Sequence, residues 1–182
     1  DSAEIKRRFA RDHADRIVQV AQLIGGAFQA GHKVLLFGNG GSSTDAAHIA
    51  AEFVGRYKRE RAPLPAIALA TDIAAITCIA NDYGFEELFA RQVHAHGQRG
   101  DVAIAISTSG NSPNVLKGVE AAKALGLTTI AWTGGTGGKL AGMVDYAFVV
   151  PSTLTARIQE SHITLGHVLC ELIEDHVLAN PA

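Results

Sequence analysis

This sequence of 182 residues contains only two cysteines and five prolines, and its formal net charge is -2. Two cysteines, Cys78 and Cys170, are too few for a disulfide framework, and their spacing is not that of a metal site. Both stand among apolar residues, so we expect them buried and reduced, as in a cytoplasmic protein. A net charge this small gives no general attraction to nucleic acid or to an anionic membrane surface, and we expect neither as a partner.

Long apolar runs are also missing. No segment approaches the roughly 18 consecutive apolar residues of a membrane-spanning helix. The charged start, DSAEIKRRF, is unlike a secretory signal peptide. The length suits about one domain with a sizeable core, so we expect a single domain over residues 1–182.

What the sequence does contain is a short apolar run followed by a glycine-rich turn. Residues 34–37, Val-Leu-Leu-Phe, predict a strand covered on both faces. Gly38, Gly40 and Gly41 let the chain turn sharply and bring its N–H groups close to a ligand, and a Ser, Thr or Asp within residues 42–45 can cap the following helix. Because a helix start favours anions, this turn predicts a phosphorylated ligand.

Three charged or titratable residues share one face of that predicted helix. His48, Glu52 and Arg56 stand at i, i+4 and i+8. One interpretation is a solvent-exposed edge on which a His–Glu pair contributes roughly a few tenths of a kcal/mol. The neighbouring residues are small or apolar, however, which indicates a largely buried helix, and buried His and Glu need a partner or a function.

The remaining chain alternates strands and helices. Residues 2–31 predict one long helix or two, at an interface with a partner subunit. Further strands are expected at 66–70, 101–107, 127–133 and 147–150, helices at 72–79, 86–96, 113–125 and 153–178, and a turn at 81–84. This alternation predicts an α/β three-layer sandwich with a central parallel, flavodoxin-like sheet and long terminal helices, whose ligand sites lie at the C-terminal ends of the strands.

A second polar turn follows the strand at 101–107. Residues 107–112, Ser-Thr-Ser-Gly-Asn-Ser, offer hydroxyls and N–H groups at a helix start and no Lys or Arg. Such a loop can hold a phosphate by hydrogen bonds alone; the alternative is a hydrophilic loop with a helix cap. Two such turns at equivalent places in two strand-turn-helix units favour a ligand site.

Two glycine-rich segments resemble nucleotide-binding motifs but lack residues that those motifs require. GNGGSS at 38–43 has serine where a dinucleotide fingerprint needs its last glycine. TGGTGGK at 133–139 is too short for a P-loop and is followed by leucine, so we expect a turn. The last predicted helix carries five candidates, and spacing alone does not choose among them: Arg157, Gln159, Glu160, His162 and His167.

Four blocks, GNGGSSTDAAHIAAEF, AIANDYGF, AISTSGNS and RIQESHITLGH, resemble the sugar isomerase (SIS) domain family and, within it, the phosphoheptose isomerases. They occur in the family's order over residues 38–167. The resemblance implies conversion of sedoheptulose 7-phosphate to D-glycero-D-manno-heptose 7-phosphate through an enediol, the first step toward the heptose of the lipopolysaccharide core. It also implies a homotetramer with active sites between subunits and one zinc ion per subunit.

The resemblance also assigns roles to individual residues. Isomerisation needs a carboxylate or an imidazole for each proton transfer, and we expect Glu52 and His167 to be this catalytic pair, with Arg56 orienting Glu52 or the sugar. The zinc ligands would be His48, Glu52, Gln159 and His167. The substrate contacts would be Asn39, Gly40, Gly41, Glu52, Asn81, Asp82, Ser107, Thr108, Ser109, Ser112 and Gln159. One departure is Ala156, where some family members carry an aspartate, so any role of that aspartate does not apply here.

Two other functions are compatible with the motifs. A non-catalytic SIS protein that binds a partner or senses a sugar phosphate would keep the glycine and serine turns and lose the acid/base residues. This chain keeps both Glu52 and His167, which favours an enzyme. An isomerase of a different ketose phosphate is the other alternative, because the turns do not reveal the length of the sugar.

Overall fold

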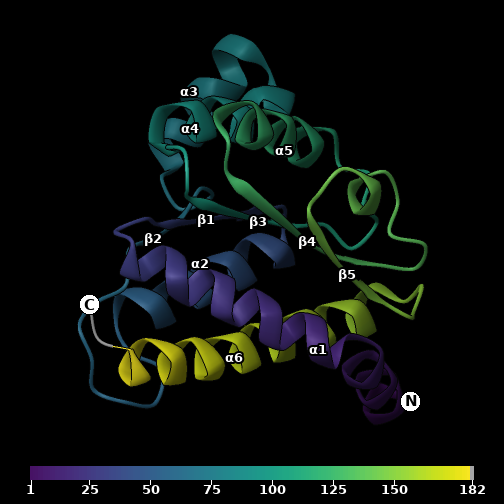
Figure 1. The fold of residues 1–182 in the computed structure, drawn as a ribbon. Helices are drawn as coiled ribbons and strands as arrows, with labels where there is room; N and C mark the ends of the chain where they lie inside the picture. Colours follow the sequence, from purple (N-terminus) through teal and green to yellow (C-terminus); the bar gives the residue numbers. More distant parts are fainter. Residues whose placement is uncertain (181–182) are drawn as a thin grey trace.

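The computed structural model describes residues 1–180; residues 181–182, which the single-domain prediction includes, lie outside the described part. Five strands form one parallel sheet in the order β2-β1-β3-β4-β5, and six α-helices flank it (Figure 1). The strands are β1 Val34–Gly38, β2 Ala66–Ala68, β3 Val102–Ile106, β4 Thr128–Gly134 and β5 Tyr146–Val150. The helices are α1 Ser2–Gln29, α2 Gly41–Val54, α3 Ile73–Tyr83, α4 Leu88–His96, α5 Pro113–Leu125 and α6 Thr155–Ala179, with short 3-10 turns at η1 Phe85–Glu87 and η2 Leu140–Gly142. The predicted flavodoxin-like α/β sandwich is confirmed.

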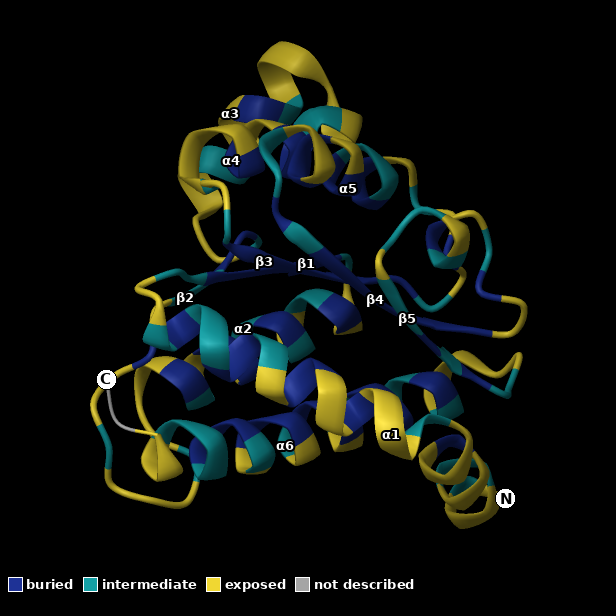
Figure 2. Cartoon of the chain, in the orientation of Figure 1, coloured by how far each residue is buried: buried dark blue, intermediate teal, exposed yellow. Residues whose placement is uncertain are grey.

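The sheet separates two helical layers. Helices α1, α2 and α6 cover one face and α3, α4 and α5 the other (Figure 1). Because successive side chains of a strand point to opposite faces, Val34 and Leu36 of β1 join the core on the α1–α2–α6 side, whereas Leu35 and Phe37 join the other core. All five residues of β1 are buried, as expected for a strand covered on both sides (Figure 2).

The strand order creates a switch point between β1 and β3. These neighbours pair in parallel, with Gly38 opposite Ile106. The two polar turns follow directly, so they lie side by side at the C-terminal edge of the sheet, where ligands of doubly wound folds bind. Their predicted meeting at this edge is confirmed.

Some predicted boundaries were wrong. The N-terminal segment, for which one helix or two were predicted, forms one, and Gly25 within it accommodates the His176 ring, which a Cβ would overlap. Helix α3 begins at its predicted cap, Asp72, whose carboxylate accepts from two N–H groups, but continues to Tyr83. Residues 81 and 82 are therefore helical and not part of a turn.

The two cysteines differ in environment. Cys170 is buried, as predicted, but Cys78 is exposed, contrary to the expectation drawn from its apolar neighbours.

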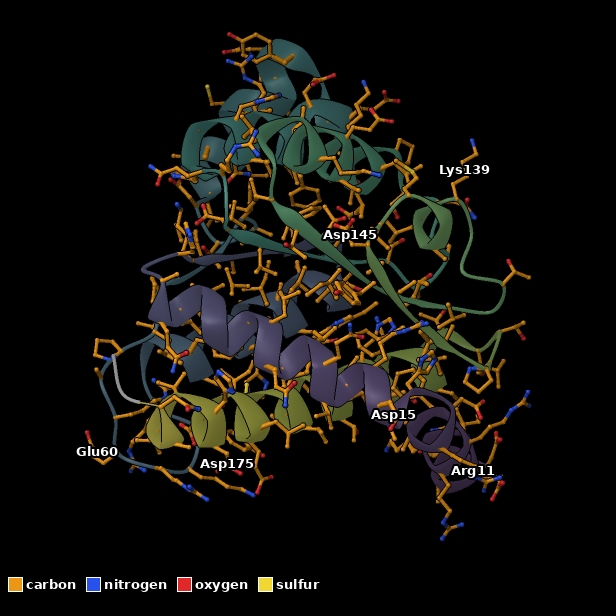
Figure 3. All side chains as sticks on the ribbon, in the orientation of Figure 1. Arg11, Asp15, Glu60, Lys139, Asp145 and Asp175 are labelled. Carbon is orange, nitrogen blue, oxygen red and sulfur yellow. The ribbon has the colours of Figure 1, made fainter. Side chains whose placement is uncertain are left out.

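Charged side chains such as Arg11, Glu60 and Lys139 extend from the periphery of the molecule (Figure 3). Among residues 1–180, no helix combines the length and apolar character needed to cross a bilayer.

Candidate active site

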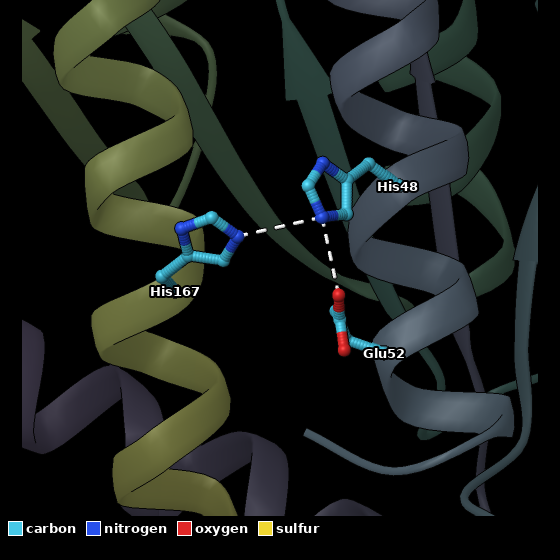
Figure 4. Close-up of side chains that lie close together, drawn as sticks. All are labelled: His48, Glu52 and His167. Carbon is cyan, nitrogen blue, oxygen red and sulfur yellow. Dashed lines mark hydrogen bonds and ion pairs between the residues drawn. The ribbon is translucent and has the colours of Figure 1, made fainter. Parts of the chain in front are cut away.

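Three side chains converge from two helices that are far apart in the sequence. His48 and Glu52 lie on α2, and His167 lies on α6 (Figure 4). His48 Nε2 is 3.1 Å from Glu52 Oε1 and 3.4 Å from His167 Nε2. Among the described residues, no hydrogen bond is made to Glu52 Oε2, so this oxygen has no protein partner. The structure thus brings together the two residues predicted to be catalytic.

The packing of α2 on α6 produces this convergence. His48 and Glu52 are one turn apart, which places them on one face of α2. Gly166, next to His167, lets the helices approach closely, because a Cβ there would lie 2.8 Å or less from the Ile49 side chain. Ile49 is itself buried between the layers. The small residue on one helix and the branched residue on the other therefore set the distance between the functional faces.

The donor atoms of this cluster fit a metal ion. One ligand atom from each of His48, Glu52 and His167 lies within 4.8 Å of the others. In a tetrahedral zinc site with bonds of about 2.0–2.1 Å, adjacent donors are roughly 3.3–3.4 Å apart, close to the 3.1 and 3.4 Å seen here. Two imidazoles and a carboxylate are a set that catalytic zinc commonly uses with an open fourth position.

Gln159, the other predicted ligand, lies elsewhere along α6. Its amide packs against Gly41, where a Cβ would overlap it. Eight residues separate Gln159 from His167, about 12 Å along the helix at its normal rise. In this conformation Gln159 therefore faces the first polar turn, and the three-residue cluster forms without it.

The other three candidates on α6, Arg157, Glu160 and His162, make contacts that hold the fold together. Arg157 pairs with Glu160, whose carboxylate accepts a 2.6 Å hydrogen bond from the Ser2 hydroxyl and so joins α6 to the start of α1. His162 is buried against β4, with Nε2 3.1 Å from the Thr133 carbonyl. Burial lowers the pKa of His162 to about 4. It is therefore neutral at physiological pH and has a place in the core.

The two polar turns are joined by a reciprocal amide pair. Asn39 and Asn114 exchange hydrogen bonds of 2.8 and 2.9 Å. Ser107 and Ser112 hydroxyls are 3.0 Å apart across the second turn. A cavity of about 290 Å³ extends from Thr108 and Ser109 of the second turn to the start of α6; hydroxyl-bearing residues dominate its lining, namely Thr108, Ser109, Thr136, Ser152, Thr153 and Thr155. This lining suits a phosphate held without a basic side chain.

The predicted side-chain cap of α2 is absent. The Ser43 and Thr44 hydroxyls donate instead to the carbonyls of Gly40 and Gly41. The helix begins after Gly40, whose φ of 56° is a conformation that glycine adopts readily. The start of α2 is thus shaped by the backbone of the glycine turn.

One residue near the cluster was not among the predicted site residues. Asp45 stands one turn before His48, and its buried Oδ2 has no hydrogen-bond partner among the described residues. Burial raises the pKa of Asp45, although the nearby His48 and His167 oppose this. The D-x-x-H-x-x-x-E spacing on one helix could have revealed it, because all three side chains fall on one face.

Three predicted residues do not reach the cluster within one chain. Asn81 and Asp82 lie on α3, on the opposite side of the sheet from α6, where Asp82 lines a separate cavity of about 620 Å³. Arg56 lies beyond the end of α2 at Val54 and pairs with Glu60 at 3.8 Å in solvent. The prediction that His48, Glu52 and Arg56 share one helix face was therefore wrong for Arg56.

The doubly wound fold, the paired polar turns and the His–Glu–His cluster together define a phosphosugar-binding protein of the SIS type. The chain belongs to the SIS domain family, whose model matches residues 1–134. Similar proteins include the phosphoheptose isomerase of Aquifex aeolicus, which is 60% identical over 177 residues, covering 97% of this chain and 93% of that protein.

Two solved structures agree with this relationship. The phosphoheptose isomerase GmhA of Neisseria gonorrhoeae is 44% identical with a TM-score of 0.90, and that of Francisella tularensis is 41% identical with a TM-score of 0.92. Each comparison covers 96% of this chain and 93% of the other. The resemblance seen in the four sequence blocks is confirmed.

Proposed function

We propose that this chain is a phosphoheptose isomerase that converts sedoheptulose 7-phosphate to D-glycero-D-manno-heptose 7-phosphate. The main support from the structure is the convergence of Glu52 and His167 on a surface shared by α2 and α6. A carboxylate and an imidazole are the groups that proton transfer between adjacent carbons and oxygens requires. A protein that only binds sugar phosphate has no need of this pair.

The two residues divide the proton transfers. Glu52 takes a proton from C1 of the ketose through Oε2, which gives an enediol, and returns it at C2. His167 moves the proton between the oxygens on C1 and C2, so that the aldehyde forms at C1 as the hydroxyl forms at C2. The Ser107–Ser112 turn holds the terminal phosphate, and Asn39, Gly40 and Gly41 contact the sugar, with Gln159 beside them.

We propose one zinc ion per chain, held by His48, Glu52 and His167. Gln159, the further predicted ligand, faces Gly41 in this structure and would have to turn toward the ion to join them. When bound, the ion would supply Lewis-acid polarisation of the substrate carbonyl. Elemental analysis of protein purified without chelator should find about one zinc per chain, and His48→Gln should lose most of it. The control His94→Gln changes an exposed histidine on α4 and should keep its zinc. Equal zinc in both variants would exclude His48 as a ligand.

Assays with three ketose phosphates test the function. Purified protein should turn over sedoheptulose 7-phosphate with a higher kcat/KM than fructose 6-phosphate or ribulose 5-phosphate. A preference for one of the shorter sugars would assign a different isomerase. No turnover of any of them, with binding retained, would favour a sugar-phosphate sensor.

We also propose a homotetramer whose active sites lie between subunits. Asn81 and Asp82 are too far from the cluster within one chain, so a second copy would have to supply them. The surface of α3 and η1 exposes Ile73, Tyr83 and Phe85, which is unusual unless a partner covers them. We assign residues 1–182 to one SIS domain, with residues 1–31 also contributing to the interface. A monomeric mass by light scattering at enzymatically active concentration would contradict this assembly.

A cytoplasmic location and a role in making lipopolysaccharide core heptose complete the proposal. The two unpaired cysteines, Cys78 and Cys170, support a reducing compartment. Cell fractionation tests the location. Loss of core heptose after deletion of the gene, with recovery on reintroduction, tests the pathway.

A further inference from the structure

A loop next to the cluster is fixed to α6 by one buried carboxylate. Glu174 Oε1 accepts a hydrogen bond from the Tyr57 N–H at 2.7 Å, and Oε2 accepts from the N–H groups of Lys58 and Arg59 at 2.9 and 3.1 Å. The Glu174 side chain is 2% exposed. Three backbone donors on one buried acceptor hold the backbone at residues 57–59 in a single position relative to α6.

Arg61 connects the same carboxylate to the end of α2. Its Nε lies 3.2 Å from Glu174 Oε1, in an ion pair that is 2% exposed on both sides. The Arg61 guanidinium donates to the carbonyls of Glu52 and Phe53 at 2.8 and 2.9 Å. It therefore satisfies the last carbonyls of α2 in the turn that carries Glu52. Glu174 and Arg61, here called the clamp, join both helices of the site.

The clamp places an aromatic ring on His167. Tyr57 stacks on the imidazole with ring centroids 5.6 Å apart and planes 18° apart. His48 meets the same imidazole edge-on, at 5.0 Å and 72°. The His167 ring is thus bounded by Tyr57 on its face and by His48 at its edge, so rotation of its plane would break both contacts.

We propose that Tyr57 is a positioning residue that fixes the plane of the His167 imidazole, and that the clamp holds Tyr57 in place. This inference rests on the proposed function, since it assigns His167 a proton to move. Tyr57 acts through His167 and does not touch the reacting atoms. The stacking face of the ring, and not the phenol hydroxyl, is the part that matters.

Kinetics of two Tyr57 variants test the role. Tyr57→Leu should lower kcat by about 10- to 100-fold, because a misplacement of about 1 Å can cost about 10²-fold, while KM changes less than about twofold. Tyr57→Phe keeps the ring and should restore kcat to within about twofold of the unmodified chain. Arg59→Ala, in the same loop, removes only an exposed pair with Asp175 and should leave both constants unchanged. An unchanged kcat in Tyr57→Leu would overturn the proposal.

NMR of the full-length protein with labelled histidine separates this inference from the function itself. The His167 ring protons should show nuclear Overhauser contacts with the Tyr57 ring and an upfield shift from its ring current in the unmodified chain. The shift should persist in Tyr57→Phe and vanish in Tyr57→Leu. Absence of the contacts in the unmodified chain would refute the stacking. Inactivity of the unmodified chain with the contacts present would refute the isomerase assignment and leave the stacking intact.

Discussion

Glu52→Gln is expected to reduce kcat with sedoheptulose 7-phosphate by at least about 10²- to 10⁴-fold, the usual contribution of general acid–base catalysis. Glutamine keeps the size of the side chain but cannot accept a proton from carbon. KM should change little, because the phosphate and most sugar contacts lie on the turns after β1 and β3. Steady-state kinetics measured across a range of substrate concentrations separate these two effects.

Two controls accompany this variant. Glu60→Gln removes a carboxylate in the loop that follows α2; this side chain is 92% exposed and lies 3.8 Å from Arg56, so the kinetics of the variant should match those of the unmodified chain. Zinc content of Glu52→Gln should be measured in the same preparation, since Glu52 is also a proposed ligand. Full activity in a folded Glu52→Gln protein would contradict its role as the base.

Arg61→Leu is expected to destabilise the fold by about 3–5 kcal/mol, the usual cost of removing one partner of a buried ion pair. Burial opposes ionisation of Glu174, yet three N–H donors and the Arg61 charge lower its pKa below the ordinary value. The carboxylate therefore stays charged at neutral pH, and without Arg61 that charge is left buried and only partly compensated. Urea unfolding at pH 7 measures the difference in unfolding free energy.

Arg59→Leu is the matched control, because it removes a pair with Asp175 that is 58% and 47% exposed. Its cost should be about 1 kcal/mol or less.

The pH dependence of the Arg61→Leu deficit gives a second check. The pKa of Glu174 is lower in the folded state than in the unfolded state, where it is near 4.3. Glu174 therefore stabilises the fold at pH values above the unfolded pKa. This contribution is lost as the pH falls through the pKa of the folded state. The Arg61→Leu deficit should therefore shrink below about pH 4; a deficit equal to that of Arg59→Leu at pH 7 would contradict the clamp.

The strands and turns were predictable because their signals are local. Each strand buried on both faces reads as a short apolar run, as Val34–Phe37 does, and the glycine and serine turns end two such runs. Helix ends were less certain. The residue types from Cys78 to Tyr83 do not distinguish the interior of a helix from a turn. Helix α2 ends at Val54, with Gly55 as its cap, although the spacing of His48, Glu52 and Arg56 would suit one continuous helical face.

The sequence by itself determined the alternating α/β architecture, the two polar turns and the one-turn spacing of His48 and Glu52, since each depends on residues a few positions apart. Only the tertiary structure decided that His167 meets His48 across 119 positions and that Tyr57 is held to Glu174 across 117. Such contacts depend on how closely two helices pack and on one side chain reaching a distant backbone. Neither leaves a periodic pattern in the chain, so the sequence carries no local sign of them.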